Sequence, residues 1–131
     1  MLQRDYLMNL LLQFVQAIRH SLLSRGNDPK GSADLLEHAL CEATDIDADL
    51  LLGLEPSSFA MILRVSSIDE HIVPYVVHSL MLVAEYLREA GEDALADLRT
   101  AQAQSLAVDY DVDIDLNHFI DTGLDIDNSN R

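Results

Sequence analysis

Apolar side chains recur every three or four residues along most of the chain, which is the spacing of helices that bury one face. Over residues 3–25 they are Leu7, Leu10, Leu11, Phe14, Val15, Ile18, Leu22 and Leu23. A turn is expected after them, because Gly26 suits a left-handed cap and Pro29 cannot continue a helix. Ser32 is a suitable N-cap for a second helix that carries the same period through Ala43. The pattern therefore predicts a helical hairpin.

Shorter apolar runs over residues 47–68 predict two short connecting helices, the second of which opens at Pro56. The next helix is expected to begin between residues 68 and 74, since a capping box and a proline favour different starts. It runs to Gly91, and the period continues in a fifth helix over residues 95–106. The apolar pattern therefore predicts an all-α domain of about five main helices.

Only residues 108–116 show a strand-like pattern, in which aspartates alternate with apolar residues. We therefore divide the chain into a helical domain, residues 1–108, and an acidic C-terminal arm, residues 109–131, whose apolar side is expected to dock on the helices.

Composition narrows the classes of function. The chain has 131 residues, 49% of them hydrophobic, enough for one domain with a real core. Its 23 acidic and 8 basic residues leave a net charge of −15. Such a protein is a poor partner for nucleic acid and for anionic membranes. With one cysteine, Cys41, no small-x-small cleavage site and no apolar run of membrane-spanning length, we expect a cytoplasmic protein.

Charge is unevenly distributed along the chain. Residues 1–30 hold four basic and two acidic residues, a net of +2, whereas residues 31–131 hold four basic and 21 acidic residues, a net of −17. The first helix is thus the only segment that the acidic remainder does not repel. It could pack on its own chain or on a second copy, so a homodimer is one expectation.

The last helical hairpin resembles the tetratricopeptide pattern. Ala84, Ala96 and Ala103 take the small-residue positions and Gly91 takes the turn, with larger apolar residues at Leu80, Val83 and Leu87. Thr100 replaces the usual aromatic residue, and Val108 stands where a proline is usual.

A second match extends the resemblance. Residues 35–40, followed by Asp45-Ile46-Asp47, look like the second helix of another unit. With the opening Met1 to Met8, the order of elements over residues 1–108 resembles an uncharacterised family of small all-helical bacterial proteins with a tetratricopeptide-like arrangement. The resemblance implies a module that binds a protein or peptide, and it brings no assigned residues.

Two histidines and the single cysteine are the candidates for metal or catalytic chemistry. His71 and His78 lie two helical turns apart, about 10.5 Å, which is too far for joint ligation of one ion. We interpret them, with Tyr75, Glu85 and Glu89, as a polar stripe that faces solvent or a partner. His38 lies one helical turn before Cys41, a spacing that a cysteine–histidine nucleophile pair could use. A small buried thiol is the commoner arrangement, and we interpret Cys41 in that way. No phosphate-binding glycine loop or serine elbow is present, so no catalytic residue and no cofactor are predicted.

The run Asp109, Asp111, Asp113 and Asp115 offers oxygen ligands at alternate positions, as calcium loops do. No starting position in the run places glycine at the sixth position of the loop and glutamate at the twelfth, so any calcium binding is expected to be weak. A weak calcium-responsive regulator is therefore the alternative function. The main hypothesis is a protein-interaction or assembly module that lacks catalysis. The predicted interaction face consists of Leu7, Leu11, Phe14, Ile18, His71, Tyr75 and His78.

Overall fold

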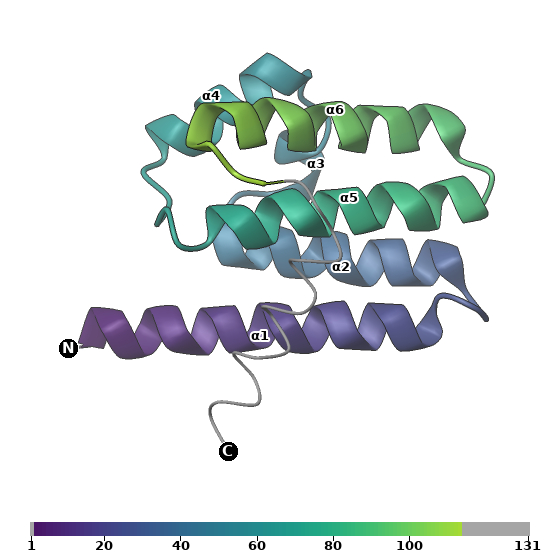
Figure 1. Ribbon diagram of the computed structural model, residues 1–131, viewed down its shortest axis with the longest axis horizontal. Coiled ribbons are helices and arrows are strands. Elements are labelled where there is room, and N and C mark those ends of the chain that lie inside the picture. The colour runs from purple at the N-terminus through teal and green to yellow at the C-terminus, as the bar shows by residue number, and fades with distance from the viewer. Residues whose placement is uncertain (1, 114–131) are drawn as a thin grey trace.

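Six helices form the regular structure of residues 2–113, the part of the chain that this computed structural model describes (Figure 1). They are α1 (Leu2–Ser24), α2 (Pro29–Thr44), α3 (Ala48–Leu51), α4 (Pro56–Val65), α5 (Val73–Glu89) and α6 (Asp93–Tyr110). No strand occurs within this part, which confirms the all-α class. None of the described helices is both long and apolar enough to cross a membrane.

Two helix ends differ from the sequence-based prediction. The N-cap of α2 is Asp28 and not Ser32: its Oδ1 accepts a hydrogen bond of 3.0 Å from the Gly31 N–H, and Pro29 takes the first turn. This start is favourable because proline lacks the N–H that a first turn leaves unbonded. Ser32 is instead buried, with its Oγ 2.6 Å from the Oγ of Ser24. Gly26 is also not in the left-handed region, where only Gly91 among the described glycines lies.

The strand-like pattern over residues 108–116 begins inside a helix, since residues 108–110 end α6 and residues 111–113 follow it without forming a strand. α6 continues through Tyr110, and Asp111 ends it in the left-handed conformation with φ of 55°. The N–H of Val112 then bonds the carbonyl of Ala107 at 2.9 Å, the closure typical of such caps. Ala107 is buried, so packing against the other helices outweighs the local alternation.

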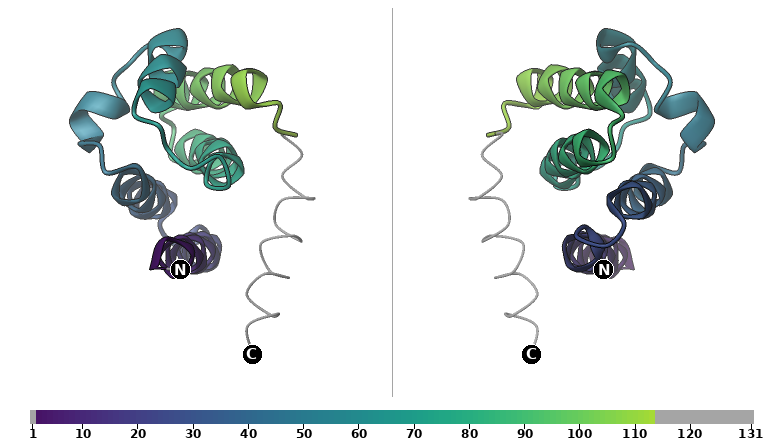
Figure 2. Two further views of the ribbon diagram at one scale, coloured as in Figure 1. Left: turned by 90° about the vertical axis from the view of Figure 1, so that its left-hand side faces the viewer. Right: turned by 90° about the vertical axis from the view of Figure 1, so that its right-hand side faces the viewer.

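The four long helices lie side by side in the order α1, α2, α5, α6 (Figure 1). Seen along the helix axes, α1 occupies one end of the stack while α4 and α6 occupy the other (Figure 2). The α1–α2 and α5–α6 pairs are antiparallel hairpins, and α2 packs on α5 to join them. α4 packs on α6 and completes the far end.

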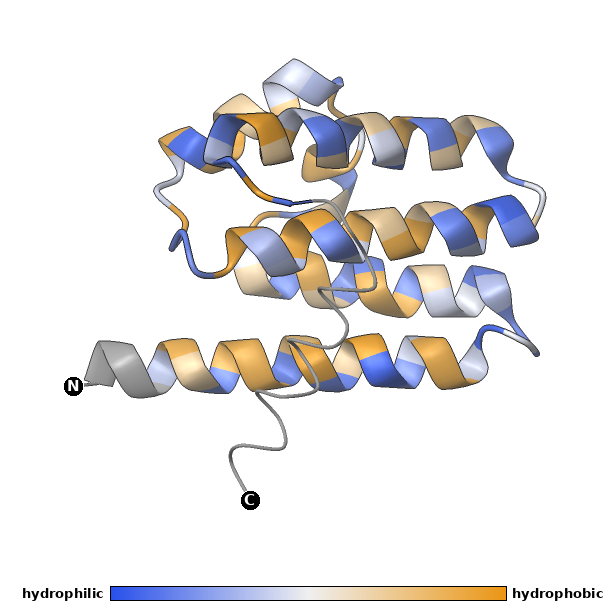
Figure 3. Cartoon of the chain, viewed as in Figure 1, coloured by the Kyte–Doolittle hydropathy of each residue, from blue (hydrophilic) through white to orange (hydrophobic). Residues whose placement is uncertain are grey.

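α5 is the central helix. Val76, Val77, Leu80 and Val83 are fully buried, and Figure 3 shows hydrophobic residues following one another along this helix. The small residues Ala84, Ala96 and Ala103 are also buried where α5 meets α6, because small side chains let two helix backbones approach closely.

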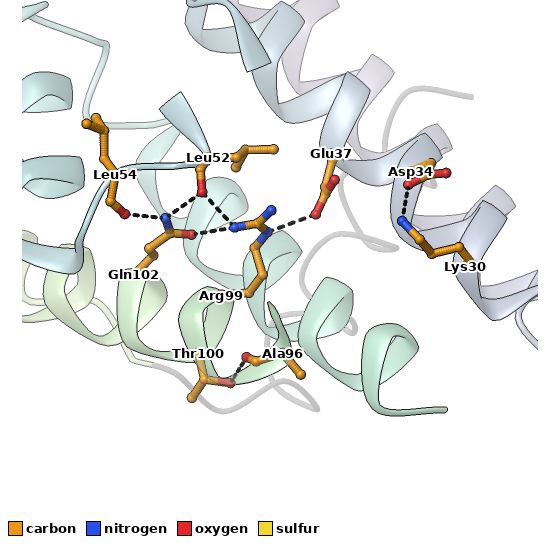
Figure 4. A network of polar contacts seen from close by, with 9 residues as sticks. All are labelled: Lys30, Asp34, Glu37, Leu52, Leu54, Ala96, Arg99, Thr100 and Gln102. Atoms are coloured by element: carbon orange, nitrogen blue, oxygen red, sulfur yellow. Dashed lines mark hydrogen bonds and ion pairs between the residues drawn. The ribbon is translucent and has the colours of Figure 1, made fainter. Parts of the chain in front are cut away.

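A polar network fixes α6 against the two short helices (Figure 4). Buried Arg99 donates from Nε to Glu37 on α2 at 2.8 Å and from Nη1 to the Leu52 carbonyl at 2.8 Å. Gln102, fully buried, accepts from Arg99 and donates to the carbonyls of Leu52 and Leu54. The network thus satisfies the backbone carbonyls that the end of α3 leaves without helical partners.

A second polar cluster holds the end of α1 against the end of α5. The Ser21 Oγ lies 2.8 Å from the Tyr86 hydroxyl, and the Arg25 guanidinium stands 5.1 Å above the Tyr86 ring. Arg25 also donates to Glu85 and Glu89. These carboxylates raise the pKa of Arg25, chiefly through the hydrogen bond that Glu89 accepts from it.

Candidate functional site

An open groove of about 480 Å³ runs between α1 and α2 on the outside of the stack. Its apolar lining consists of Leu10, Phe14, Ala17, Leu35, Ala39 and Ala43. Its polar lining consists of Gln13, Gln16, His20, His38 and Glu42. No lysine or arginine is among these residues. The lining is therefore divided between apolar and polar side chains, a combination that recognition sites often show.

Small residues explain why the groove exists. Ala17 on α1 and Ala39 and Ala43 on α2 lie half-buried along the seam between the helices, where leucine side chains would fill the space. Phe14 closes the bottom of the groove, since it stacks on Tyr75 of α5 with ring centroids 6.1 Å apart and is 2% exposed. The groove therefore has a rigid floor that belongs to the core.

A second depression of about 330 Å³ continues the groove past the end of α2. It shares His38 and Glu42 with the groove and adds Cys41, Asp45, Ile46, Asp47 and Ala48. We call Glu42, Asp45 and Asp47, which are all exposed, the acidic end. Asp45 ends α2 in the left-handed conformation with φ of 58°, so its side chain is not used by the helix it ends.

The residues predicted for the interaction face on α1 are mostly buried, and of the four only Phe14 lines the groove. Leu11, Phe14 and Ile18 are 9%, 2% and 6% exposed and belong to the core. Leu7 is half-buried against the same core. The reason is that α1 is a terminal helix whose broad apolar face is covered by α2 and by the end of α5. What α1 offers outside is the adjacent strip that lines the groove.

The predicted polar stripe is not continuous on the surface of α5, although its Glu85 and Glu89 are accessible and pair with Arg25. Tyr75 and His78 are buried, and His78 Nδ1 lies 2.7 Å from the Pro74 carbonyl. His71 precedes α5 in an exposed loop, where Asp69 accepts hydrogen bonds from its backbone N–H and ring. Those bonds lower the pKa of Asp69. The loop geometry places His71 away from the helix face on which His78 lies.

Cys41 and His38 do not form a nucleophile pair. Cys41 is 8% exposed, and burial raises the pKa of its thiol from 9.0 to about 11. His38 Nε2 instead lies 3.1 Å from Glu42, one turn further on, at the rim of the groove. A reactive cysteine needs a lowered pKa, so the raised pKa of Cys41 does not favour a nucleophilic role.

The aspartate run is divided between a helix, its cap and the chain beyond. Asp109 lies in α6 and accepts from Arg64 at 2.6 Å, Asp111 ends α6, and Asp113 is exposed. Asp115 lies outside the described residues. Within residues 2–113, no three side chains of the metal-binding types come together.

The chain was compared with known proteins at the level of sequence and structure. No family model, no curated protein and no solved structure matches it. The resemblance to tetratricopeptide hairpins therefore rests on the residues quoted for it, and the site has to be interpreted from its own geometry.

Proposed function

We propose that this protein is a non-catalytic interaction module of the cytoplasm that binds a helical segment of another protein in the groove between α1 and α2. The hairpins α1–α2 and α5–α6 are, in this proposal, two tetratricopeptide-like units. The observation that carries the proposal is the solvent-open groove, whose lining combines apolar and polar side chains over the buried ring of Phe14.

The dimensions suit a helix as the occupant. The groove extends along α1 from Leu10 to His20, ten residues and hence about 15 Å at a rise of 1.5 Å per residue. A ligand helix of about three turns has that length. Alanines in the seam admit its protruding apolar side chains, which is the arrangement by which helices bind in grooves.

The calcium alternative is less well supported. Arg64 already balances the charge of Asp109, and Asp111 is held at a helix cap. Calcium needs six to eight oxygen ligands, so a site would have to draw on residues elsewhere in the arm.

Site-directed photo-crosslinking in the cells that make the protein tests the proposal. A crosslinking amino acid at Gln16, on the rim of the groove, is expected to capture a defined partner. The same amino acid at Gln104, an exposed glutamine of α6 at the other end of the stack, is the matched control. The captured protein is then purified and titrated against the wild-type chain and against Ala39→Glu, which puts a charge on the groove floor.

Binding by the wild type and loss of binding with Ala39→Glu would support the groove as the site. Equal capture at Gln16 and Gln104, or full affinity of Ala39→Glu in a variant that remains folded, would overturn it. Capture of the chain by itself from Gln16 would identify a second copy as the occupant and support the homodimer expectation.

A further inference from the structure

We infer that the partner segment is a cationic amphipathic helix: its apolar face enters the groove, and lysine or arginine residues at one of its ends lie over the acidic end. This inference rests on the proposed function and adds the chemistry of the partner.

The acidic end is continuous with the groove, so one helix can contact both. The two depressions share His38 and Glu42, and Asp45 and Asp47 line the second one with Ile46 as its apolar floor. No lysine or arginine lines either depression. Three carboxylates therefore have no arginine or lysine beside them in the lining, where the groups that become cationic on protonation are His38, beside Glu42, and His20 in the groove.

Elsewhere in the described residues, several acidic side chains are neutralised by arginine. Glu85 and Glu89 pair with Arg25, Asp97 pairs with Arg88, and Glu37 pairs with Arg99. Within residues 2–113, Glu42, Asp45 and Asp47 have no arginine partner of this kind and adjoin the groove, so their charge is within reach of a helix seated there. Cations from a partner would supply what the chain itself does not, and exposed carboxylates carry little desolvation cost before binding.

The net charge of the whole chain favours the same partner. At −15 the protein attracts cations over a range of about 10 Å at ordinary salt. A second copy carries the same −15 and the same acidic end, so two copies meeting at this groove would repel each other. Charge complementarity thus favours a basic segment over a second copy.

Synthetic helical peptides of about 15 residues test the inference with defined probes. Three peptides share leucine and alanine at positions i, i+3, i+4 and i+7. They differ in that one has three lysines at its N-terminal end, one has them at its C-terminal end, and one has glutamines in both places. Affinity for the full chain is measured by fluorescence anisotropy at about 0.02 M and about 0.3 M salt.

One of the lysine peptides is expected to bind about tenfold more tightly than the glutamine peptide at low salt, and the difference should shrink at high salt. Asp45→Asn with Asp47→Asn should reduce that advantage several-fold and leave the glutamine peptide unaffected. Asparagine is chosen because it tolerates the left-handed conformation of residue 45. Glu92→Gln with Asp93→Asn removes the same charge at the exposed start of α6 and is the matched control.

The outcomes separate this inference from the proposed function. Equal binding of all three peptides, lost with Ala39→Glu, would overturn the cationic partner and support the groove. An equal effect of both double variants would also overturn it, because the attraction would then be a property of net charge alone. Absence of binding by every peptide, with a dimer seen by light scattering that Ala39→Glu abolishes, would replace the basic partner with a second copy.

Discussion

Cys41 shows how the environment of one residue decides its chemistry. It lies one helical turn from His38 in the sequence, yet the histidine contacts Glu42 while the thiol lies among apolar neighbours. Periodicity predicts that residue 41 lies near the buried face. The His38 ring lies against Glu42, the charged residue four positions later, because both side chains are exposed on the same side of α2.

Stability at alkaline pH should depend on Cys41. The pKa of the thiol is about 11 in the folded protein and 9.0 in an ordinary environment, so the folded state favours the protonated form. This contribution is fully present below pH 9 and is lost as the pH rises through about 11. We expect Cys41→Ala to show a smaller fall in melting temperature over that range than the wild type.

Tyr75 and Tyr86 also have pKa values raised by burial, but they are present in both proteins and cancel in the comparison. If the melting temperatures of the wild type and of Cys41→Ala fall equally over this pH range, folding does not raise the pKa of the thiol.

At the scale of elements, the turn between α5 and α6 depends on Gly91. Its φ is +85°, a conformation that residues with a Cβ adopt at a cost. We expect Gly91→Ala to lower the free energy of unfolding by about 1 kcal/mol, although no atom lies within 4 Å of the added Cβ. Gly26→Ala is the control: its surroundings are equally open and its φ is not positive, so chemical denaturation should show no loss.

The packing of α6 depends on Arg99. Arg99→Met would leave the partly buried Glu37 without its partner and remove one donor to the Leu52 carbonyl. We expect a loss of about 3 kcal/mol in the free energy of unfolding, because breaking a buried ion pair strands a charge.

Arg88→Met removes an exposed pair with Asp97 and should cost less than about 1 kcal/mol. Urea titration of both variants gives the comparison. Similar small losses in the two would mean that Arg99 contributes no more than a surface ion pair.

Sequence periodicity predicted the helices well and their partners poorly. The turn between α1 and α2, the turn at Gly91, the short helices and the long α5 all follow from local patterns. The groove does not, because Ala39 and Ala43 leave an open seam only when α1 lies beside them at a particular angle. The burial of Phe14 likewise depends on Tyr75, which lies 61 positions later in the sequence. A pattern within one helix cannot report either relation.

The excess of negative charge acts on the molecule as a whole. At a net charge of −15 the acidic side chains repel one another, and folding strengthens this repulsion because it brings them closer together. We expect the melting temperature to rise as sodium chloride is added from about 0.02 M to about 0.2 M, because screening relieves that repulsion. Differential scanning fluorimetry is sufficient for the measurement. A falling melting temperature would mean that the exposed ion pairs, such as Arg64 with Asp109, contribute more than the repulsion removes.

The contact between α1 and α5 has a consequence for synthesis of the chain on the ribosome. Ser21 and Arg25 meet Tyr86 and Glu89, partners that lie 65 and 64 positions later. At about 5 to 20 residues per second, α1 waits several seconds for these partners after it has been made. During that interval its apolar face has at most α2 to cover it. Because α1 is synthesised early and packs against α5 late, it is a natural substrate for ribosome-associated chaperones.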